Sequence, residues 1–310
     1  MKTLPEGLWP VMLTPFTATN EVDLPGLERL TAMYLEAGSS GLFANCLSSE
    51  MYQLTEAERL LITRTVVNVC GEAAPVVATG TFSRDTSANV AFIKRLYDTG
   101  VQAVILITGM LVEPDESEEI LKERLEQILE QTDGIPLGVY ECPMPYKRLL
   151  SPALMKWMAA TGRFVYHKDT SCNSPAMVRK AEAVKGSRFG LYNADTTTAL
   201  DSLEAGFRGI SPISANFYPE PYSFLLREYR THGRTESLNR LHALLTMMDR
   251  VTHNFYPYAA KVFLQRRGLK IETNTRIPAE ALPNADQLRL SALMESFRAV
   301  ADLYSIPLIL

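Results

Sequence analysis

The chain has 310 residues, of which 46% are hydrophobic and 21% are charged, and its formal net charge at pH 7 is -4. This length suits two average domains or one large α/β barrel. The small excess of acidic residues gives no general attraction to nucleic acid or to an anionic membrane. No stretch approaches the roughly 18 uninterrupted apolar residues of a membrane span, and Met1–Pro10 lacks the apolar core of a signal peptide. We therefore expect a cytoplasmic protein with reduced cysteines that binds neither nucleic acid nor membrane.

Strand-like and helix-like patterns alternate along the first two thirds of the chain. Short apolar, β-branched runs bounded by turn residues predict strands, and the amphipathic stretches between them predict helices. The predicted strands are Val11–Phe16, Gly41–Cys46, Pro75–Gly80, Ala103–Thr108, Ile135–Tyr140, Phe164–Lys168, Phe189–Tyr192 and Gly209–Ile213. From about Glu228 onward only helical patterns remain, at Arg234–Val251, Asn254–Arg267 and Asp286–Leu303.

This succession predicts an α/β protein with the fold of a (β/α)8 TIM barrel. The barrel is expected over residues 1–230, with a C-terminal helical extension over residues 231–310 packed on it. A doubly wound parallel sheet is the alternative, but the glycine-rich fingerprint expected after its first strand is absent.

Lys168 closes the sixth predicted strand and is followed by Asp-Thr-Ser. Side chains alternate along a strand, so Lys168 shares a face with Phe164 and Tyr166. If that face is buried, desolvation lowers the pKa of the ammonium, and a free amine can attack a ketone to form a Schiff base. The alternative is a lysine whose charged head reaches solvent at the strand end.

Polar residues also stand at or after the ends of other predicted strands: Tyr140, Ser48, Ser49, Asp195 and Ser211. The C-terminal ends of barrel strands meet at the face that carries the active site, so these groups are predicted to converge there. Two of them have ordinary alternatives, since Tyr140 could be a core tyrosine and Asp195 could merely cap the next helix.

The chain resembles the dihydrodipicolinate synthase / N-acetylneuraminate lyase superfamily of pyruvate-type class I aldolases from about Gly7 to Leu303. The similarity is carried by Trp9-Pro10-Val11, Thr14-Pro15-Phe16, Leu54-Thr55-Glu56, Val139-Tyr140 and Lys168-Asp169-Thr170-Ser171. The resemblance implies that Lys168 forms the Schiff base and that Tyr140 relays protons beside it. It also implies a homo-oligomer, a tetramer or a dimer, and a reaction that needs no metal or organic cofactor.

The sequence departs from the family at three places. The loop after the second strand, normally Gly-(Thr/Ser)-Thr-Gly-Glu, here reads Cys46-Leu47-Ser48-Ser49-Glu50. Its second hydroxyl is kept as Ser48, which with nearby backbone N–H groups is predicted to hold a carboxylate, whereas Leu47 removes the first. Leu111 follows the fourth strand where synthases have a tyrosine, and no arginine directly follows Pro143, where synthases grip their second substrate.

Together these features predict a Schiff-base lyase, an aldolase or a dehydratase, that acts on a small-molecule 2-oxo acid. A 2-keto-3-deoxy sugar acid that releases pyruvate is the favoured substrate class, and Ser48, Ser49, Asp195 and Ser211 are its predicted contacts. The alternative is a catalytically weakened member that binds or senses a 2-oxo acid. A true dihydrodipicolinate synthase is disfavoured because the arginine is missing, and the cysteines have no metal-binding spacing.

Overall fold

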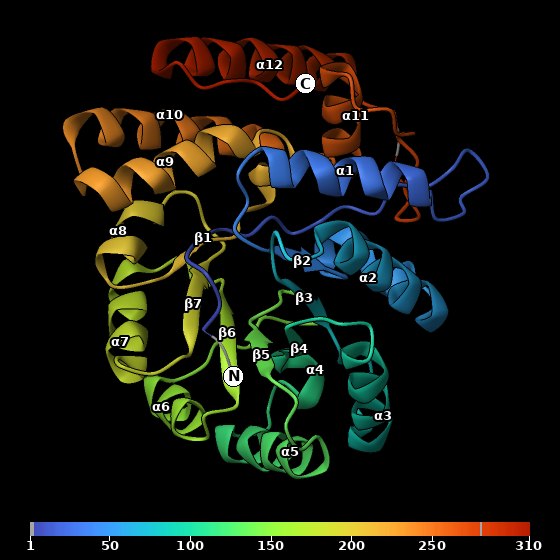
Figure 1. Ribbon diagram of the computed structural model, residues 1–310, viewed down its shortest axis with the longest axis vertical. Coiled ribbons are helices and arrows are strands. Elements are labelled where there is room, and N and C mark those ends of the chain that lie inside the picture. The colour runs from blue at the N-terminus through green and yellow to red at the C-terminus, as the bar shows by residue number, and fades with distance from the viewer. Residues whose placement is uncertain (1–2, 280) are drawn as a thin grey trace. The chain divides into compact units, whose positions relative to one another are not determined.

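Strands and helices alternate along most of the chain in the computed structural model, which describes residues 3–279 and 281–310 (Figure 1). The chain divides into two units. The first consists of the residues up to Glu6 and Pro75–Ile210, and the second consists of Gly7–Ala74 and Ser211–Leu310. Of the residues described, none forms a helix that is both long enough and apolar enough to span a bilayer.

The first unit is built on a parallel sheet whose strands follow one another in chain order. These strands are β3 (Val76–Thr79), β4 (Ala103–Ile107), β5 (Leu137–Tyr140), β6 (Phe164–Asp169), β7 (Gly190–Asn193) and β8 (Gly209–Ile210). Their connecting helices are α3 (Thr86–Tyr97), α4 (Thr108–Leu111), α5 (Glu118–Gln131), α6 (Pro152–Ala160), α7 (Ser174–Val184) and α8 (Ala199–Glu204). Figure 1 shows α3 and α5–α8 along one side of this curved sheet. Every strand residue is buried, as expected for a parallel sheet covered on both faces.

The pairing of β5 with β6 places two of the predicted site residues next to each other. The register shifts between Leu137 and Gly138, and from there Tyr140 pairs with Lys168. A Cβ atom at Gly138 would lie only 2.8 Å from the carbonyl oxygen of Tyr166, so this close approach of the two backbones requires glycine.

The second unit joins segments from both ends of the chain. From the N-terminal part come β1 (Gly7–Leu8), α1 (Leu24–Glu36), β2 (Leu42–Ala44), the 3-10 turns Leu47–Ser49 and Met51–Gln53, and α2 (Glu56–Cys70). From the C-terminal part come the 3-10 turn Ile213–Asn216, α9 (Pro219–His232), α10 (Glu236–Thr252), α11 (Tyr258–Arg267) and α12 (Asn284–Tyr304). Aromatic rings fill the centre of the C-terminal part, where Phe263 packs against Phe217 at 5.4 Å between ring centroids and against Phe297 at 6.3 Å.

The predicted (β/α)8 barrel with a C-terminal helical extension is confirmed, but the predicted first strand is wrong. The strand is Gly7–Leu8, and within Val11–Phe16 only isolated bridges form, from Val11 to Phe43 and from Phe16 to Val22. Pro10 and Pro15 lack the N–H groups that a continuous ladder needs. The helix predicted from Asn254 begins only at Tyr258, after Pro257, and α9 was not predicted. The boundary at residue 230 stays a prediction.

Candidate active site

Lys168 and Tyr140 lie side by side at the C-terminal ends of β6 and β5. Lys168 is 3% exposed and Tyr140 is 4% exposed, and the Lys168 Nζ lies 4.8 Å from the centroid of the Tyr140 ring. The solvent-reaching lysine, considered as an alternative, is therefore excluded. An amine buried against an aromatic ring is shielded from bulk water, which protects an imine from hydrolysis.

The register shift breaks the predicted alternation of β6, because Phe164, expected to share the face of Lys168, packs against Trp157 of α6 at 6.5 Å between ring centroids and against Phe189, which His167 also contacts. Beyond the shift, side chains alternate up to Lys168. Tyr166, two residues earlier, is fully buried and stacks on Tyr192 of β7, with 4.6 Å between ring centroids. These rings fix the neighbouring backbone, so the direction in which Lys168 projects is set by packing.

A buried cluster of polar and charged side chains lies on the opposite face of β6, and we call it the rear cluster. It consists of His167 and Asp169 of β6, Glu141 directly after β5, and Lys180 of α7. Ligand atoms of Glu141, His167 and Asp169 all lie within 4.8 Å of one another, a spacing that a metal ion can bridge. The Nζ of Lys180 already lies 2.6 Å from each of the two carboxylates. An ammonium thus occupies the position of the cation, and these donors do not fit a metal site.

The charges of the rear cluster control the ionisation of Glu141. Burial acts to raise the pKa of its carboxyl, but the interactions with His167 and Lys180 outweigh burial and lower that pKa to about 2. Glu141 therefore stays ionised at any physiological pH, although its side chain is fully buried.

The two serines of the loop after β2 make different contacts. Ser49 braces the loop, because its hydroxyl donates to the Met12 carbonyl at 2.6 Å and its N–H donates to the Cys46 carbonyl at 3.0 Å. Ser48 is 5% exposed and forms a side-chain hydrogen bond with Tyr256. Of the two serines, Ser48 is thus the better candidate for a substrate contact.

Tyr256 connects Ser48 to a chain of buried polar groups. Its hydroxyl accepts a hydrogen bond from the Asn216 Nδ2 at 2.6 Å, and the Asn216 Oδ1 accepts a hydrogen bond from Tyr34. Burial raises the pKa of the Tyr256 hydroxyl well above its ordinary value, so the group stays protonated at neutral pH. Sequence reasoning missed this residue, because it lies inside a stretch predicted to be helical.

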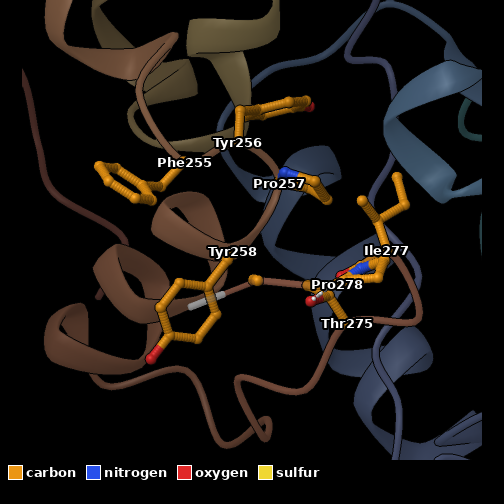
Figure 2. A pocket seen from close by; sticks show the side chains of 8 residues that line it. Phe255, Tyr256, Pro257, Tyr258, Thr275, Ile277 and Pro278 are labelled. Atoms are coloured by element: carbon orange, nitrogen blue, oxygen red, sulfur yellow. Dashed lines mark hydrogen bonds between the residues drawn. The ribbon is translucent and has the colours of Figure 1, made fainter. Parts of the chain in front are cut away.

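A pocket of about 260 Å³ lies next to Tyr256 and is shown in Figure 2. Its lining residues carry no charge and are Phe255, Tyr256, Pro257, Tyr258, Thr275, Ile277, Pro278 and Ala279. In Figure 2 the hydroxyls of Tyr256 and Tyr258 point in different directions. The hydroxyl of Tyr256 is the one that bonds to Ser48.

Glu50 also braces the loop after β2. Its Oε1 lies 2.9 Å from the Nζ of the fully buried Lys261, and its Oε2 accepts hydrogen bonds from the N–H groups of Arg276 and Ile277. Burial lowers the pKa of Lys261 to about 8, although the charge of Glu50 opposes this shift. The Glu50 carboxylate therefore holds α11 to the loop through Oε1 and the segment around Arg276 through Oε2.

Asp195 and Ser211 are each bound to neighbouring backbone or side-chain groups. The Asp195 Oδ2 accepts hydrogen bonds from the N–H of Thr198 at 3.0 Å and from its hydroxyl at 2.8 Å, which caps the turn before α8. The Ser211 hydroxyl donates to the Trp9 carbonyl at 2.6 Å and is fully buried. A role for either residue in substrate binding stays a prediction.

The model of the dihydrodipicolinate synthetase family matches residues 4–297. The chain belongs to this family. It is 24% identical to a 4-hydroxy-tetrahydrodipicolinate synthase of Oceanobacillus iheyensis over 92% of this chain and 95% of the relative. It is 27% identical to a synthase of the same name from Bacillus subtilis, over 91% of this chain and 95% of that relative.

Solved structures of the family share the fold. A dihydrodipicolinate synthase from Bacillus anthracis superposes with a TM-score of 0.85 at 22% identity, over 94% of this chain and 98% of that one. A prophage protein of the family from E. coli K12, solved in complex with pyruvate, gives a TM-score of 0.83 at 22% identity, over 94% of this chain and 98% of that one. The chain is thus a member of a class I aldolase family with the (β/α)8 fold.

The basic residues nearest to the position of the synthase arginine are engaged in local contacts. The Lys147 Nζ donates to the Thr170 carbonyl at 2.9 Å, and Arg148 donates to the Glu116 carbonyl at 2.8 Å. Leu111 is 4% exposed and offers no hydroxyl. A hydroxyl does lie beside it, because Tyr146 of the loop after β5 donates to the Val112 carbonyl at 2.7 Å.

Proposed function

We propose that this protein is a Schiff-base lyase that acts on a 2-oxo acid. The observation that carries the proposal is the buried amine of Lys168, 4.8 Å from the centroid of the Tyr140 ring on the neighbouring strand. An unprotonated amine in this setting attacks the ketone of the substrate, and the tetrahedral adduct loses water to give an iminium ion.

The iminium cation then serves as the electron sink. A base removes the proton of the C4 hydroxyl, C4 becomes the carbonyl of a departing aldehyde, and the electron pair of the C3–C4 bond moves into the iminium to give an enamine. The enamine takes up a proton at C3, and water hydrolyses the resulting iminium to release pyruvate and the free amine of Lys168. Tyr140 is the proposed acid and base for the proton transfers, work that contributes about 10² to 10⁴ in rate. By its place in the loop that corresponds to the family's carboxylate-binding loop, Ser48 is the proposed partner of the substrate carboxylate.

The test is reduction of the imine with borohydride in the presence of pyruvate, followed by intact-mass measurement and peptide mapping. Wild-type protein is expected to gain one reduced pyruvate adduct on Lys168, and Lys168→Ala to gain none. Lys147→Ala is the matched control, because Lys147 is exposed and its Nζ donates to the Thr170 backbone carbonyl in the neighbouring loop. An unmodified wild type, or an adduct on Lys168→Ala, would refute the proposal.

The proposed substrates are 2-keto-3-deoxy sugar acids. Aldol cleavage and dehydration use the same Lys168 and Tyr140, and the products distinguish them: pyruvate for cleavage, and an oxo acid of unchanged carbon number for dehydration. The named relatives are synthases, but a second carboxylate needs an arginine's bidentate grip, and Lys147 and Arg148 are engaged elsewhere. Dihydrodipicolinate formation is therefore expected to be at least about 10- to 100-fold slower than by a synthase.

Binding of a 2-oxo acid without turnover is the second candidate function. It is favoured by Leu47 and Leu111, which remove two hydroxyls that the family uses to pass protons. A steady-state assay over a panel of sugar-derived oxo acids separates the two functions, since trapping without turnover of any substrate would support the second.

A further inference from the structure

The rear cluster joins the residues that directly follow the proposed catalytic pair. Glu141 follows Tyr140 at the end of β5, and Asp169 follows Lys168 at the end of β6. Both carboxylates point away from the aromatic face that carries Lys168, and both reach Lys180 on α7 at 2.6 Å. One buried ammonium therefore links the ends of the two strands that carry the proposed active site.

Two bonds of Thr170 also join these strand ends. The Thr170 hydroxyl donates to the Glu141 carbonyl at 2.6 Å, and the Thr170 N–H donates to the Glu141 Oε2 at 3.2 Å. By comparison, the backbone bond between the strands at this point, from the Glu141 N–H to the Lys168 carbonyl, is long at 3.3 Å. Side-chain contacts thus secure the strands where the backbone ladder weakens.

The charge balance shows why Lys180 is essential to this arrangement. Glu141 and Asp169 are fully buried and would repel each other without a cation between them. Breaking a buried ion pair by removing one partner leaves an uncompensated charge, so the carboxylates would separate, admit water or take up a proton. Separation of the carboxylates, or entry of water between them, would move Glu141 and Asp169, the residues that follow Tyr140 and Lys168.

We propose that Lys180 is a positioning residue for catalysis, whose ammonium fixes the ends of β5 and β6 and thereby the separation between the Lys168 amine and the Tyr140 ring. This inference rests on the proposed Schiff-base function. Lys180 acts through the backbone and touches neither the substrate nor the reacting atoms. Because displacement of a reacting group by about 1 Å can cost about 100-fold in rate, loss of Lys180 is expected to slow imine formation about 10- to 100-fold.

The experiment measures the rate at which pyruvate and borohydride label folded protein, at a temperature well below each variant's unfolding midpoint. Lys180→Met is expected to label about 10- to 100-fold more slowly than wild type. Lys180→Arg is expected to keep more of the rate, because a guanidinium can bridge two carboxylates. The matched control is Lys185→Met at the C-terminal end of the same helix, where the side chain is 75% exposed and pairs only with Glu182.

Folded Lys180→Met that labels at the wild-type rate would overturn the inference, as would equal slowing in the Lys185→Met control. Should Lys180→Met not fold, the double variant with Glu141→Gln replaces it, because it removes one positive and one negative charge together. That variant must also label slowly if the bridge positions the strands. Failure of the wild type itself to label would refute the Schiff-base proposal, and is thereby distinguished from failure of this inference.

Discussion

Replacement of Glu141 by glutamine tests whether the rear cluster stabilises the fold through charge. The pKa of Glu141 is about 2 in the folded protein, against an ordinary value of 4.5. The folded pKa is the lower one, so the stabilisation is complete above pH 4.5 and is lost as the pH falls towards 2. A separation of about 2.5 pKa units corresponds to about 3 kcal/mol at pH 7, of which about 1 kcal/mol remains at pH 3.

The assay is urea unfolding followed by circular dichroism at pH 7 and at pH 3. Glu141→Gln is expected to lower the free energy of unfolding by about 3 kcal/mol at pH 7 and by about 1 kcal/mol at pH 3. The control is Glu126→Gln on α5, which removes an exposed carboxylate paired with Lys122 and should change stability by less than about 1 kcal/mol. A difference between wild type and Glu141→Gln that is the same at both pH values would refute the reasoning.

Further predictions concern the tyrosines, a buried lysine and assembly. Tyr140→Phe keeps the ring beside the amine, so the pyruvate adduct should still form while turnover falls about 10²- to 10⁴-fold in steady-state assays. Tyr256→Phe removes the partner of the Ser48 hydroxyl and should raise KM for the oxo acid more than it lowers kcat, whereas Tyr258→Phe should leave both unchanged. Lys261→Met should lower the free energy of urea unfolding by about 3–5 kcal/mol, because it leaves a buried carboxylate unpaired. The family relationship predicts a tetramer or a dimer in light scattering, and a monomer at micromolar concentration would contradict it.

The elements with strong local patterns could be predicted from the sequence. The amphipathic stretch between the fourth and fifth predicted strands is α5, and the strand predicted from Phe164 is β6. The period of the apolar residues and the turn residues at the ends suffice for such elements. The prediction failed at the proline-rich start of the chain. Val11–Phe16 has the composition of a strand, but Pro10 and Pro15 have no N–H group to donate to a strand ladder.

For the residues of the candidate site, too, prediction succeeded only where a local sequence pattern marks the residue. Lys168 and Tyr140 could be predicted, because each stands at the end of a recognisable strand and register then makes them neighbours. Lys180 and Tyr256 could not. Each acts through a contact with a residue that is distant in sequence, and an amphipathic helix or a loop offers no local signal that one particular lysine or tyrosine is turned inward.

The second unit contains the two outer parts of the chain, and this has a consequence for protein synthesis. Gly7–Ala74 leaves the ribosome first, but the rest of its unit, Ser211–Leu310, is made last. At roughly 5–20 residues per second, translation of Pro75–Ile210 alone imposes a delay on the order of 10 s. Trp9, whose carbonyl accepts a hydrogen bond from Ser211, and Tyr34, whose hydroxyl donates to Asn216, lack these C-terminal partners throughout that interval. We therefore expect chaperones to bind the N-terminal segment of the nascent chain, because it waits without the C-terminal part of its unit.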